Sequence, residues 1–411
     1  MLATLIPLFD DEMTVCAYSI FAQKENFLLN PSLAGRAKFD GATNILGMDI
    51  LNNIGIDTLT GGREVFVEVS NVSLFSDIES LCSVPHDKLV LLMDYHVEPE
   101  KMYLDRLRAL KNLGYKLAIR KVTVEKFDAY KDVLRLMDYI LLNHKKVNMK
   151  TAKFFFDKFF PDKKLIAVNV ESSDDYEKLK EQGGYDLYEG PFFRMPRKEP
   201  GEGLAPLKVN YINLLNVVND PDFKLEDAAA VIGRDTSLVI ELLAMVNHMT
   251  VNSEITSVQH AAAMLGQKEL RKWINTVVAK ELCSDKPSEI MRVSMLRAKF
   301  AENLAPIFEQ ASQSSELFLT GLFSVLDIIL ERPLVDALNM VKVSRGIQDA
   351  LLNGRGNLAM VLNFLKEYEN ASWQEVSRLM LLGNIDMDKV YNAYVDSLMW
   401  YKELLSAKVT K

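Results

Sequence analysis

The sequence predicts an α/β barrel followed by an all-α bundle, and three observations support this fold class. In the first half, short runs rich in branched and aromatic residues alternate with amphipathic stretches of helical spacing. A segment rich in proline and glycine, residues 191–206, then breaks the pattern. After it, apolar residues recur at helical spacing and no convincing strand follows. We therefore expect two domains, residues 1–197 and 207–411, joined by a linker at residues 198–206.

Six strand-like runs carry the barrel prediction. They begin at Val65, Lys88, Tyr115, Asp138, Leu165 and Asp186, and successive starts differ by 23, 27, 23, 27 and 21 residues. This spacing is the length of one strand plus one helix. Residues 4–9 and 14–21 flank an acidic turn at residues 10–12 and predict a hairpin. Parallel strands with crossover helices predict a small (β/α) barrel whose functional groups lie at the carboxyl ends of the strands.

Length and composition exclude several classes of protein. The chain has 411 residues, 49% of them hydrophobic and 25% charged, which favours a folded protein of two domains over a disordered or fibrous one. Residues 1–9 have no cationic start and do not resemble a signal peptide, and no apolar run is long enough to span a bilayer. The three cysteines, Cys16, Cys82 and Cys283, are far apart and favour a reducing compartment. We therefore expect a cytoplasmic protein with no membrane partner.

The net charge of −8 is unevenly distributed. Residues 101–164 contain 17 Lys and Arg against 7 Asp and Glu. Such a stretch could attract nucleic acid through phosphate contacts. Its cations are interleaved at helical spacing and no ordered set of stacking aromatic residues accompanies them. This pattern favours outer barrel helices, or docking against the acidic second half, and we expect no nucleic-acid partner.

The expected carboxyl ends of the barrel strands carry few acids. They place Ser19, Glu68, Leu92, Arg120, Lys121, Asn143, Asn169, Glu171 and Glu189 at one end of the barrel. A phosphodiester hydrolase with two metal ions needs several converging carboxylates, and cations cannot ligate such ions. We expect Glu68 and Glu171 to pair with Arg120 or Lys121, and we expect no metal site and no cofactor.

Five segments of the first half resemble the EAL domains, which hydrolyse cyclic di-GMP. Residues 17–23 (AYSIFAQ) resemble the opening A-Y-E-L-L-x-R motif, and residues 62–70 (GREVFVEVS) resemble the strand with a metal-binding asparagine. Residues 113–119 (LGYKLAI) are similar to the run before a pair of aspartates. Residues 165–172 (LIAVNVES) resemble the strand with a lysine and a glutamate, and residues 188–193 (YEGPFF) resemble the closing Q-G-x-x-F segment. The resemblance covers residues 1–197 and implies a barrel of the EAL type.

The functional positions of this family are changed in the chain. The resemblance places Ser19 at the metal-ligand glutamate and Gln23 at the arginine that contacts the substrate phosphate. The other family ligands are replaced at Glu68, Leu92, Arg120, Lys121, Asn143, Asn169 and Glu189. Glu171 alone retains the family identity. From these losses we expect that the chain is not an enzyme and that binding of cyclic di-GMP is disfavoured.

The second half predicts a helical bundle. Tyr211, Leu214, Leu215 and Val218 form one apolar stripe, and residues 225–232, 238–246 and 387–405 are further helical segments. Gly233 and Gly266 are placed to end helices, and Asp235 or Thr236 is placed to cap one. His248 and His260 are not followed by aspartate, so we expect neither to bind a metal ion.

Four segments of this half resemble the HDOD domain, a relative of HD phosphohydrolases without their metal ligands. Residues 235–238 (DTSL) are similar to D-P-x-L, and residues 245–248 (MVNH) to L-x-x-N-S. Residues 257–266 (SVQHAAAMLG) resemble I-x-S-x-x-x-A-x-x-x-L-G. Residues 318–327 (FLTGLFSVLD) resemble the G-L-L-H-D segment, with Ser324 and Val325 at the histidine and aspartate.

Bacterial signalling proteins with an EAL domain followed by an HDOD domain are known, and the resemblance implies this organisation. We expect a non-catalytic adaptor that binds an unidentified signalling protein through its helical half, with the barrel as a sensing or dimerisation unit. Exposed apolar groups among Met245, Met249, Met264 and Trp273 are candidate contacts, although for any single one of them packing in the core is the favoured interpretation. The alternatives are a receptor that binds cyclic di-GMP without hydrolysis and, least favoured, an active phosphodiesterase.

Overall fold

The computed structural model describes residues 1–26, 28, 45–194, 206–249 and 255–406. Internal contacts divide the chain into two units. The first consists of Met1–Met195 together with Phe364–Lys411, and the second of Pro196–Asn363. Each unit is described by itself.

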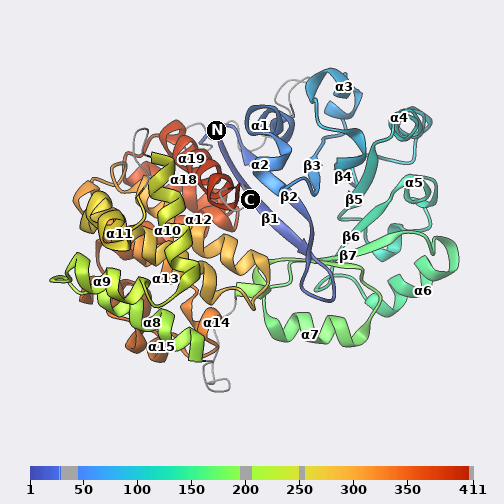
Figure 1. Cartoon of the computed structure of the whole chain (residues 1–411). Helices are drawn as coiled ribbons and strands as arrows, with labels where there is room; N and C mark the ends of the chain where they lie inside the picture. Colours follow the sequence, from blue (N-terminus) through green and yellow to red (C-terminus); the bar gives the residue numbers. More distant parts are fainter. Residues whose placement is uncertain (27, 29–44, 195–205, 250–254, 407–411) are drawn as a thin grey trace. The chain divides into compact units, whose positions relative to one another are not determined.

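The first unit contains a closed barrel in which eight strands follow one another in sequence order (Figure 1). The strands are β1 Leu2–Phe9, β2 Val15–Gln23, β3 Glu64–Glu68, β4 Leu89–Asp94, β5 Lys116–Arg120, β6 Tyr139–Asn143, β7 Lys164–Val168 and β8 Leu187–Glu189. β1 runs antiparallel to both of its neighbours, and all other pairs are parallel. Strands β2–β8 therefore end on one side, which we call the mouth of the barrel. The predicted barrel is confirmed, and the predicted hairpin corresponds to β1 and β2.

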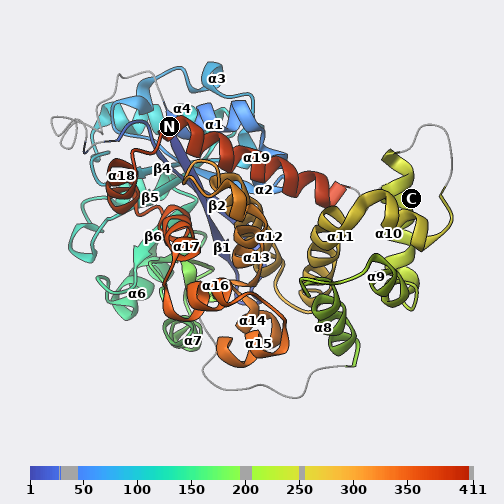
Figure 2. The same cartoon turned by 90° about the vertical axis from the view of Figure 1, so that its left-hand side faces the viewer.

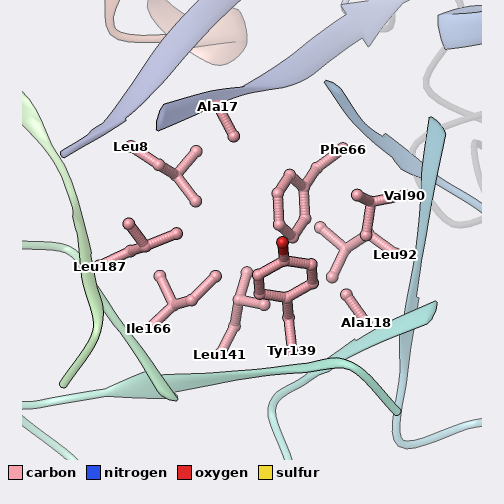
Figure 3. Close-up of a cluster of buried hydrophobic side chains, with 10 residues drawn as sticks. All are labelled: Leu8, Ala17, Phe66, Val90, Leu92, Ala118, Tyr139, Leu141, Ile166 and Leu187. Atoms are coloured by element: carbon pink, nitrogen blue, oxygen red, sulfur yellow. The ribbon is translucent and has the colours of Figure 1, made fainter. Parts of the chain in front are cut away.

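Apolar side chains fill the inside of the barrel (Figure 3). The cluster consists of Leu8, Ala17, Phe66, Val90, Leu92, Ala118, Tyr139, Leu141, Ile166 and Leu187. Phe66 and Tyr139 meet edge to face, with ring centroids 5.1 Å apart. At the amino-terminal end of the strands, the hydroxyl of Tyr139 donates a hydrogen bond of 2.7 Å to Glu64. The barrel is thus a packed core and not a channel, so chemistry is confined to its ends.

Helices join the parallel strands on the outside of the barrel (Figure 1). They are α1 Leu46–Ile54, α2 Ile56–Thr60, α3 Ile78–Leu81, α4 Lys101–Asn112, α5 Lys131–Leu136, α6 Met149–Phe159 and α7 Ser173–Gln182, with short 3-10 turns η2 Ser73–Phe75, η3 His86–Lys88, η4 Val124–Lys126 and η5 Pro191–Arg194. Local sequence sets where they begin. The Ser172 hydroxyl accepts a hydrogen bond from the Asp175 amide at the start of α7, and Asn148 caps α6 in the same way.

The carboxyl-terminal segment from Phe364 belongs to the barrel unit. It contains the end of α17 Asn357–Glu369, then α18 Trp373–Leu382 and α19 Met387–Ser406. Helix α19 contacts β1, the antiparallel strand, and α2 (Figure 2). The Ala3 amide in β1 donates to the hydroxyl of the buried Tyr368 at 3.2 Å.

The second unit is helical, and the described residues from 206 onwards contain no strand. Its helices are α8 Pro206–Val218, α9 Leu225–Ile232, α10 Thr236–Met249, α11 Val258–Leu282, α12 Ser288–Leu304, α13 Ser314–Phe323, α14 Leu326–Leu330, α15 Leu334–Met340, α16 Arg345–Gln348 and the first part of α17, with a 3-10 turn η6 Ala311–Gln313 and a π-helical turn η7 Asp349–Asn353. Asp235 caps α10 by accepting from the amides of Ser237 and Leu238. Gly266 interrupts α11 at a kink between two helical segments, with a non-helical φ of 72° and ψ of 169°, as its predicted role at a helix end implies.

Helices α12 and α13 pack against each other at Gly321. A Cβ atom on this glycine would lie 2.6 Å from the Ala298 amide nitrogen in α12. The absence of a side chain therefore permits the close approach of the two helices.

The domain boundaries predicted from the sequence differ from this division. The sequence assigns residues 207–411 to one helical domain, whereas the contacts place Phe364–Lys411 with the barrel. Helical periodicity marks a segment as helix but does not say which core it joins. The predicted linker, residues 198–206, lies almost entirely outside the described residues. Within the described part of the chain, no helix has the length and apolarity needed to cross a membrane.

Candidate functional site at the mouth of the barrel

The predicted site residues lie on six strands, β2–β6 and β8, and in the segments that follow β5 and β7. Glu68, Arg120, Asn143 and Glu189 are the last residues of β3, β5, β6 and β8. Lys121 and Asn169 follow β5 and β7, and both have left-handed backbone conformations with φ of 64° and 62°. A positive φ is uncommon for a residue with a side chain and is found at functional loops.

Glu189 and Ser19 form a buried pair at the mouth. The Ser19 hydroxyl donates to Oε2 of Glu189 at 2.9 Å, and the two residues are 1% and 8% exposed. Burial raises the pKa of the Glu189 carboxyl, while the hydrogen bond from Ser19 and the charge of Arg120 act in the opposite direction. Glu189 is therefore an acid in a poorly solvated position, where its ionisation is costly.

Arg120, whose charge acts on Glu189, forms an ion pair with Glu68. Its Nη2 lies 2.5 Å from Oε1 of Glu68, and the arginine side chain is 18% exposed. Its Nε is buried without a hydrogen-bond partner among the described residues. Arg120 thus pairs with Glu68, as the sequence predicts, and retains one N–H group that could donate to an anion.

A second cluster forms where β4 ends, and the sequence did not single it out. The Nδ1 atom of His96 lies 2.7 Å from Oδ1 of Asp94, and Nζ of Lys121 lies 3.9 Å from Oδ2 of Asp94. Burial opposes ionisation of Asp94, but the hydrogen bonds from His96 and the nearby Lys121 hold its pKa below the usual range. One sequence feature could have indicated this cluster, because Asp94 directly follows the predicted buried strand. The resemblance pointed instead to Leu92, two residues earlier.

The remaining predicted residues lie apart from the Arg120 pair. Nζ of Lys145 lies 2.5 Å from Oε2 of Glu171, which is mostly exposed, so Glu171 pairs with a residue outside the predicted set. Asn143 accepts from the Lys145 amide at 3.0 Å. The side chain of Leu92 points into the barrel core (Figure 3) and does not reach the mouth.

Gln23, at the end of β2, is engaged by the carboxyl-terminal segment. Its Nε2 donates to the Ser377 hydroxyl at 3.0 Å and to the Glu25 carbonyl at 2.6 Å. Asn26 donates to the Ser377 carbonyl at 3.0 Å. After β8, Arg194 forms an ion pair of 2.5 Å with Glu369. No sequence pattern indicated these contacts, because their partners are distant in the chain.

The EAL resemblance implies divalent metal ions at the mouth of the barrel. The question is whether the acidic side chains there could ligate such ions. Divalent ions of this kind take several oxygen ligands from converging carboxylates. Here Glu68 and Glu171 each pair with a cation. Asp94 is bonded to His96 with Lys121 3.9 Å away, and Glu189 is held by Ser19. Within the described residues, no three His, Cys, Asp or Glu side chains are grouped to hold a metal ion. This arrangement of side chains does not fit such an ion.

Comparison with known proteins identifies the class. Residues 204–335 match the family model of the HDOD domain. The match and the eight-stranded barrel confirm the predicted organisation, an EAL-like barrel followed by an HDOD domain.

Two relatives match nearly the whole chain. YuxH of Bacillus subtilis, described as uncharacterized, is 27% identical over 98% of this chain and 98% of its own length. CdgJ of Vibrio cholerae, named a cyclic di-GMP phosphodiesterase, is 23% identical over 89% of this chain and 84% of its own length.

Solved structures of EAL proteins are similar to part of the chain. The EAL enzyme Bd1971, in a form bound to cAMP and cyclic di-GMP, gives a TM-score of 0.37 at 14% identity over 46% of this chain and 60% of its own. YkuI of Bacillus subtilis, in complex with cyclic di-GMP and calcium, gives a TM-score of 0.35 at 14% identity over 46% and 53%. The matches thus cover less than two thirds of either protein.

The prediction that the chain is not an enzyme is wrong. CdgJ, which is related over most of both chains, is named a phosphodiesterase. The prediction relied on the residue types at positions assigned by resemblance, and such an assignment overlooks acids at neighbouring positions. Asp94 is an example, since it lies at the end of β4 while the resemblance pointed to Leu92.

Proposed function

We propose that this protein is a regulator in cyclic di-GMP signalling that transmits its signal by contact between the helical unit and a partner protein. The signalling system is inferred from CdgJ, whose name assigns it to cyclic di-GMP. The mode of action is inferred from the HDOD match and from the surface of the second unit.

The observation that carries the proposal is an exposed apolar surface on α10. Ile240 and Met249 are 62% and 67% exposed, and Ala244 and His248 follow Ile240 at intervals of four residues on the same exposed face. We call Ile240, Ala244 and His248, together with Met249 at the end of the helix about half a turn away from Ile240, the α10 face. Met264 in α11 is also half exposed. Large apolar side chains gathered on one helix are typical of protein-binding surfaces.

Two of the contacts predicted from the sequence lie on this surface. Met249 and Met264 are exposed, whereas Met245 and Trp273 are partly covered. Methionine and isoleucine contacts favour a partner with an apolar groove, because flexible thioether side chains adapt to irregular apolar surfaces.

The test compares partner capture by full-length proteins. A tagged chain and its Ile240→Asp/Met249→Asp variant are exposed to lysate, retained proteins are identified, and affinity for the purified candidate is measured by calorimetry. Two buried charges at an interface should weaken binding at least about 100-fold. Met360→Asp is the matched control, because Met360 is half exposed in the second unit but lies outside the HDOD match. If the Ile240→Asp/Met249→Asp variant binds the partner as tightly as Met360→Asp does, the α10 face is not the partner-binding surface.

The second part of this proposal is that cyclic di-GMP binds at the mouth of the barrel. Arg120 supports this placement, since it is a partly exposed cation at the mouth and its Nε has no hydrogen-bond partner among the described residues. Calorimetry with cyclic di-GMP should show saturable binding that Arg120→Ala weakens about tenfold or more. If the unaltered chain does not bind cyclic di-GMP, the nucleotide part of the proposal is refuted. Partner binding by the α10 face is still tested by the capture experiment.

A second candidate function, cyclic di-GMP phosphodiesterase, is favoured by the name of CdgJ. Turnover of the dinucleotide by the purified chain, with Mn²⁺ or Mg²⁺ added, tests it directly. Glu171 is the acid that retains the family identity and is mostly exposed near Lys145. Loss of turnover in Glu171→Ala would assign the activity to this barrel, and turnover unchanged in that variant would point to a contaminant or to other acids.

A further inference from the structure

Helix α6 presents aromatic and cationic side chains together on its outer face. Lys150, Lys153, Phe154 and Lys158 recur at intervals of three and four residues and are all exposed. Ala152 and Phe156, on the opposite side of the helix, are buried. Figure 1 shows α6 on the outside of the barrel strands. We call the exposed side, together with Phe159 and Lys131, the α6 face.

The two phenylalanines of the α6 face are unusually exposed. Phe154 is 69% and Phe159 is 42% exposed. Single exposed apolar side chains are common on protein surfaces. Here two aromatic rings lie among lysines, with Nζ of Lys131 4.0 Å from the centroid of Phe159 and Nζ of Lys158 5.2 Å from the same ring. This combination suits a partner that has both an apolar region, in which the rings can be buried, and a negative charge.

The charge of the α6 face is predominantly positive. Within the described part of the chain, Lys150, Lys153 and Lys158 form no ion pair, and Lys131 pairs with Asp128 at 2.6 Å. Asp157 is the acid on the exposed side of the helix itself. The face thus offers uncompensated cations around an apolar centre.

We propose that the α6 face docks peripherally on an anionic lipid surface. Lysines attract negative head groups over a short distance, and exposed phenylalanines enter the boundary between head groups and acyl chains. The expectation of no membrane partner concerned spanning segments, and a peripheral surface of this kind needs none.

Other occupants fit the α6 face less well. A symmetric second copy would place lysine opposite lysine across the two-fold axis, which is repulsive. Nucleic acid is recognised with free aromatic faces and with arginine forks. The cations of this face are all lysines, and two of them already lie over the Phe159 ring. Lysine suits a diffuse anionic surface, because it acts as a point charge without bidentate geometry.

Vesicle sedimentation of the full-length protein tests the proposal. Vesicles of phosphatidylcholine alone are compared with vesicles in which about one third is phosphatidylglycerol. We expect sedimentation with the anionic vesicles only, and its loss at high salt. The Lys150→Gln/Lys153→Gln/Lys158→Gln variant and the Phe154→Ala/Phe159→Ala variant should each bind at least about tenfold more weakly.

Matched controls test whether any loss of vesicle binding is specific to the α6 face or follows from a change in net charge or surface hydrophobicity anywhere on the protein. Lys178→Gln/Lys268→Gln/Lys389→Gln removes the same charge from exposed positions elsewhere, and Phe75→Ala removes another exposed ring. Both should bind like the unaltered chain. Circular dichroism checks that every variant folds, which is expected because the changed side chains are exposed.

Four results would overturn the proposal. The unaltered chain could stay in the supernatant with anionic vesicles, or the control lysine variant could lose as much binding as the α6 variant. Sedimentation velocity could show a dimer that the Phe154→Ala/Phe159→Ala variant dissociates, which would assign the face to a second copy. Binding of an anionic oligonucleotide that outcompetes the vesicles would assign it to nucleic acid.

Discussion

Nε2 of Gln23 donates a hydrogen bond of 3.0 Å to the hydroxyl of Ser377, across 354 residues of sequence. Gln23 ends β2, and Ser377 is a fully buried residue of α18. The same serine accepts from Asn26 through its carbonyl. One residue of the carboxyl-terminal segment therefore holds the first loop of the barrel mouth.

Replacing Ser377 by alanine should loosen this loop. The change removes one partly buried hydrogen bond and should lower the free energy of unfolding by about 1 kcal/mol in urea titrations. Amide hydrogen exchange of residues 20–26 should become faster. The control is Ser397→Ala, where a buried serine loses a bond to the Ala393 carbonyl within α19. Faster exchange of residues 20–26 in both variants, or in neither, would contradict a specific role for Ser377.

Tyr368→Phe should destabilise the barrel unit through β1. The variant keeps the buried ring, including its edge contact with Trp373 at 5.4 Å, and removes the acceptor of the Ala3 amide. An unpaired buried amide costs about 1 to 3 kcal/mol, which chemical denaturation measures. Tyr185→Phe is the matched control, since the Tyr185 hydroxyl is buried without a hydrogen-bond partner among the described residues. A loss of stability no larger than that of the control would show that the bond to Ala3 contributes little.

Glu189 should make stability decrease as pH rises. Burial raises the pKa of its carboxyl above the ordinary value of 4.5. The folded chain therefore keeps the proton at pH values where the unfolded chain has lost it, and stability falls between the ordinary and the raised pKa. Glu189→Gln cannot titrate, so its unfolding free energy should fall less over this range and exceed that of the unaltered chain near neutral pH.

Thermal or urea unfolding from pH 4.5 upward measures this difference, with the exposed Glu12→Gln as control. Parallel pH profiles for the unaltered chain and Glu189→Gln would mean that Glu189 is solvated in the folded protein.

Gly321→Ala should disturb the packing of α12 and α13. The new Cβ atom would approach the backbone of α12, 2.6 Å from the Ala298 nitrogen, and a helix backbone cannot move aside cheaply. Overpacking of this kind costs about 1 to 3 kcal/mol, and unfolding in urea should show it. Gly346→Ala provides the comparison, since the nearest atom to its Cβ would be a Leu358 side-chain carbon at 3.6 Å. Equal stabilities of the two variants would contradict the close approach.

The strands of the barrel were predictable because their signal is local. The predicted starts at Val65 and Lys88 lie within one residue of the starts of β3 and β4, since a short run rich in branched and aromatic residues marks a strand wherever it pairs. Helix α9 has the predicted bounds, Leu225–Ile232, for the same reason. At the mouth, the ion pair between Glu68 and Arg120 followed from parallel strands that end together.

Other features of the site could not be read from the sequence. The partner of Glu171 is Lys145 and not a residue of β5, because pairing depends on how the loops fold and not on the order of strands. The cluster of Asp94 and His96 was missed because the resemblance pointed to Leu92. The expectation of an inactive protein failed for a related reason, since it judged side chains one position at a time.

By itself, the sequence determined the alternation of strands and helices, the change to an all-helical second half, and the clustering of cations in residues 101–164. These are patterns of neighbouring residues, which set backbone preferences and the buried side of each element. Only the tertiary structure decided that α18 and α19 join the barrel unit and that Ser377 reaches Gln23. Such contacts depend on where whole elements pack, and the periodicity of a helix says which side is buried but not what buries it.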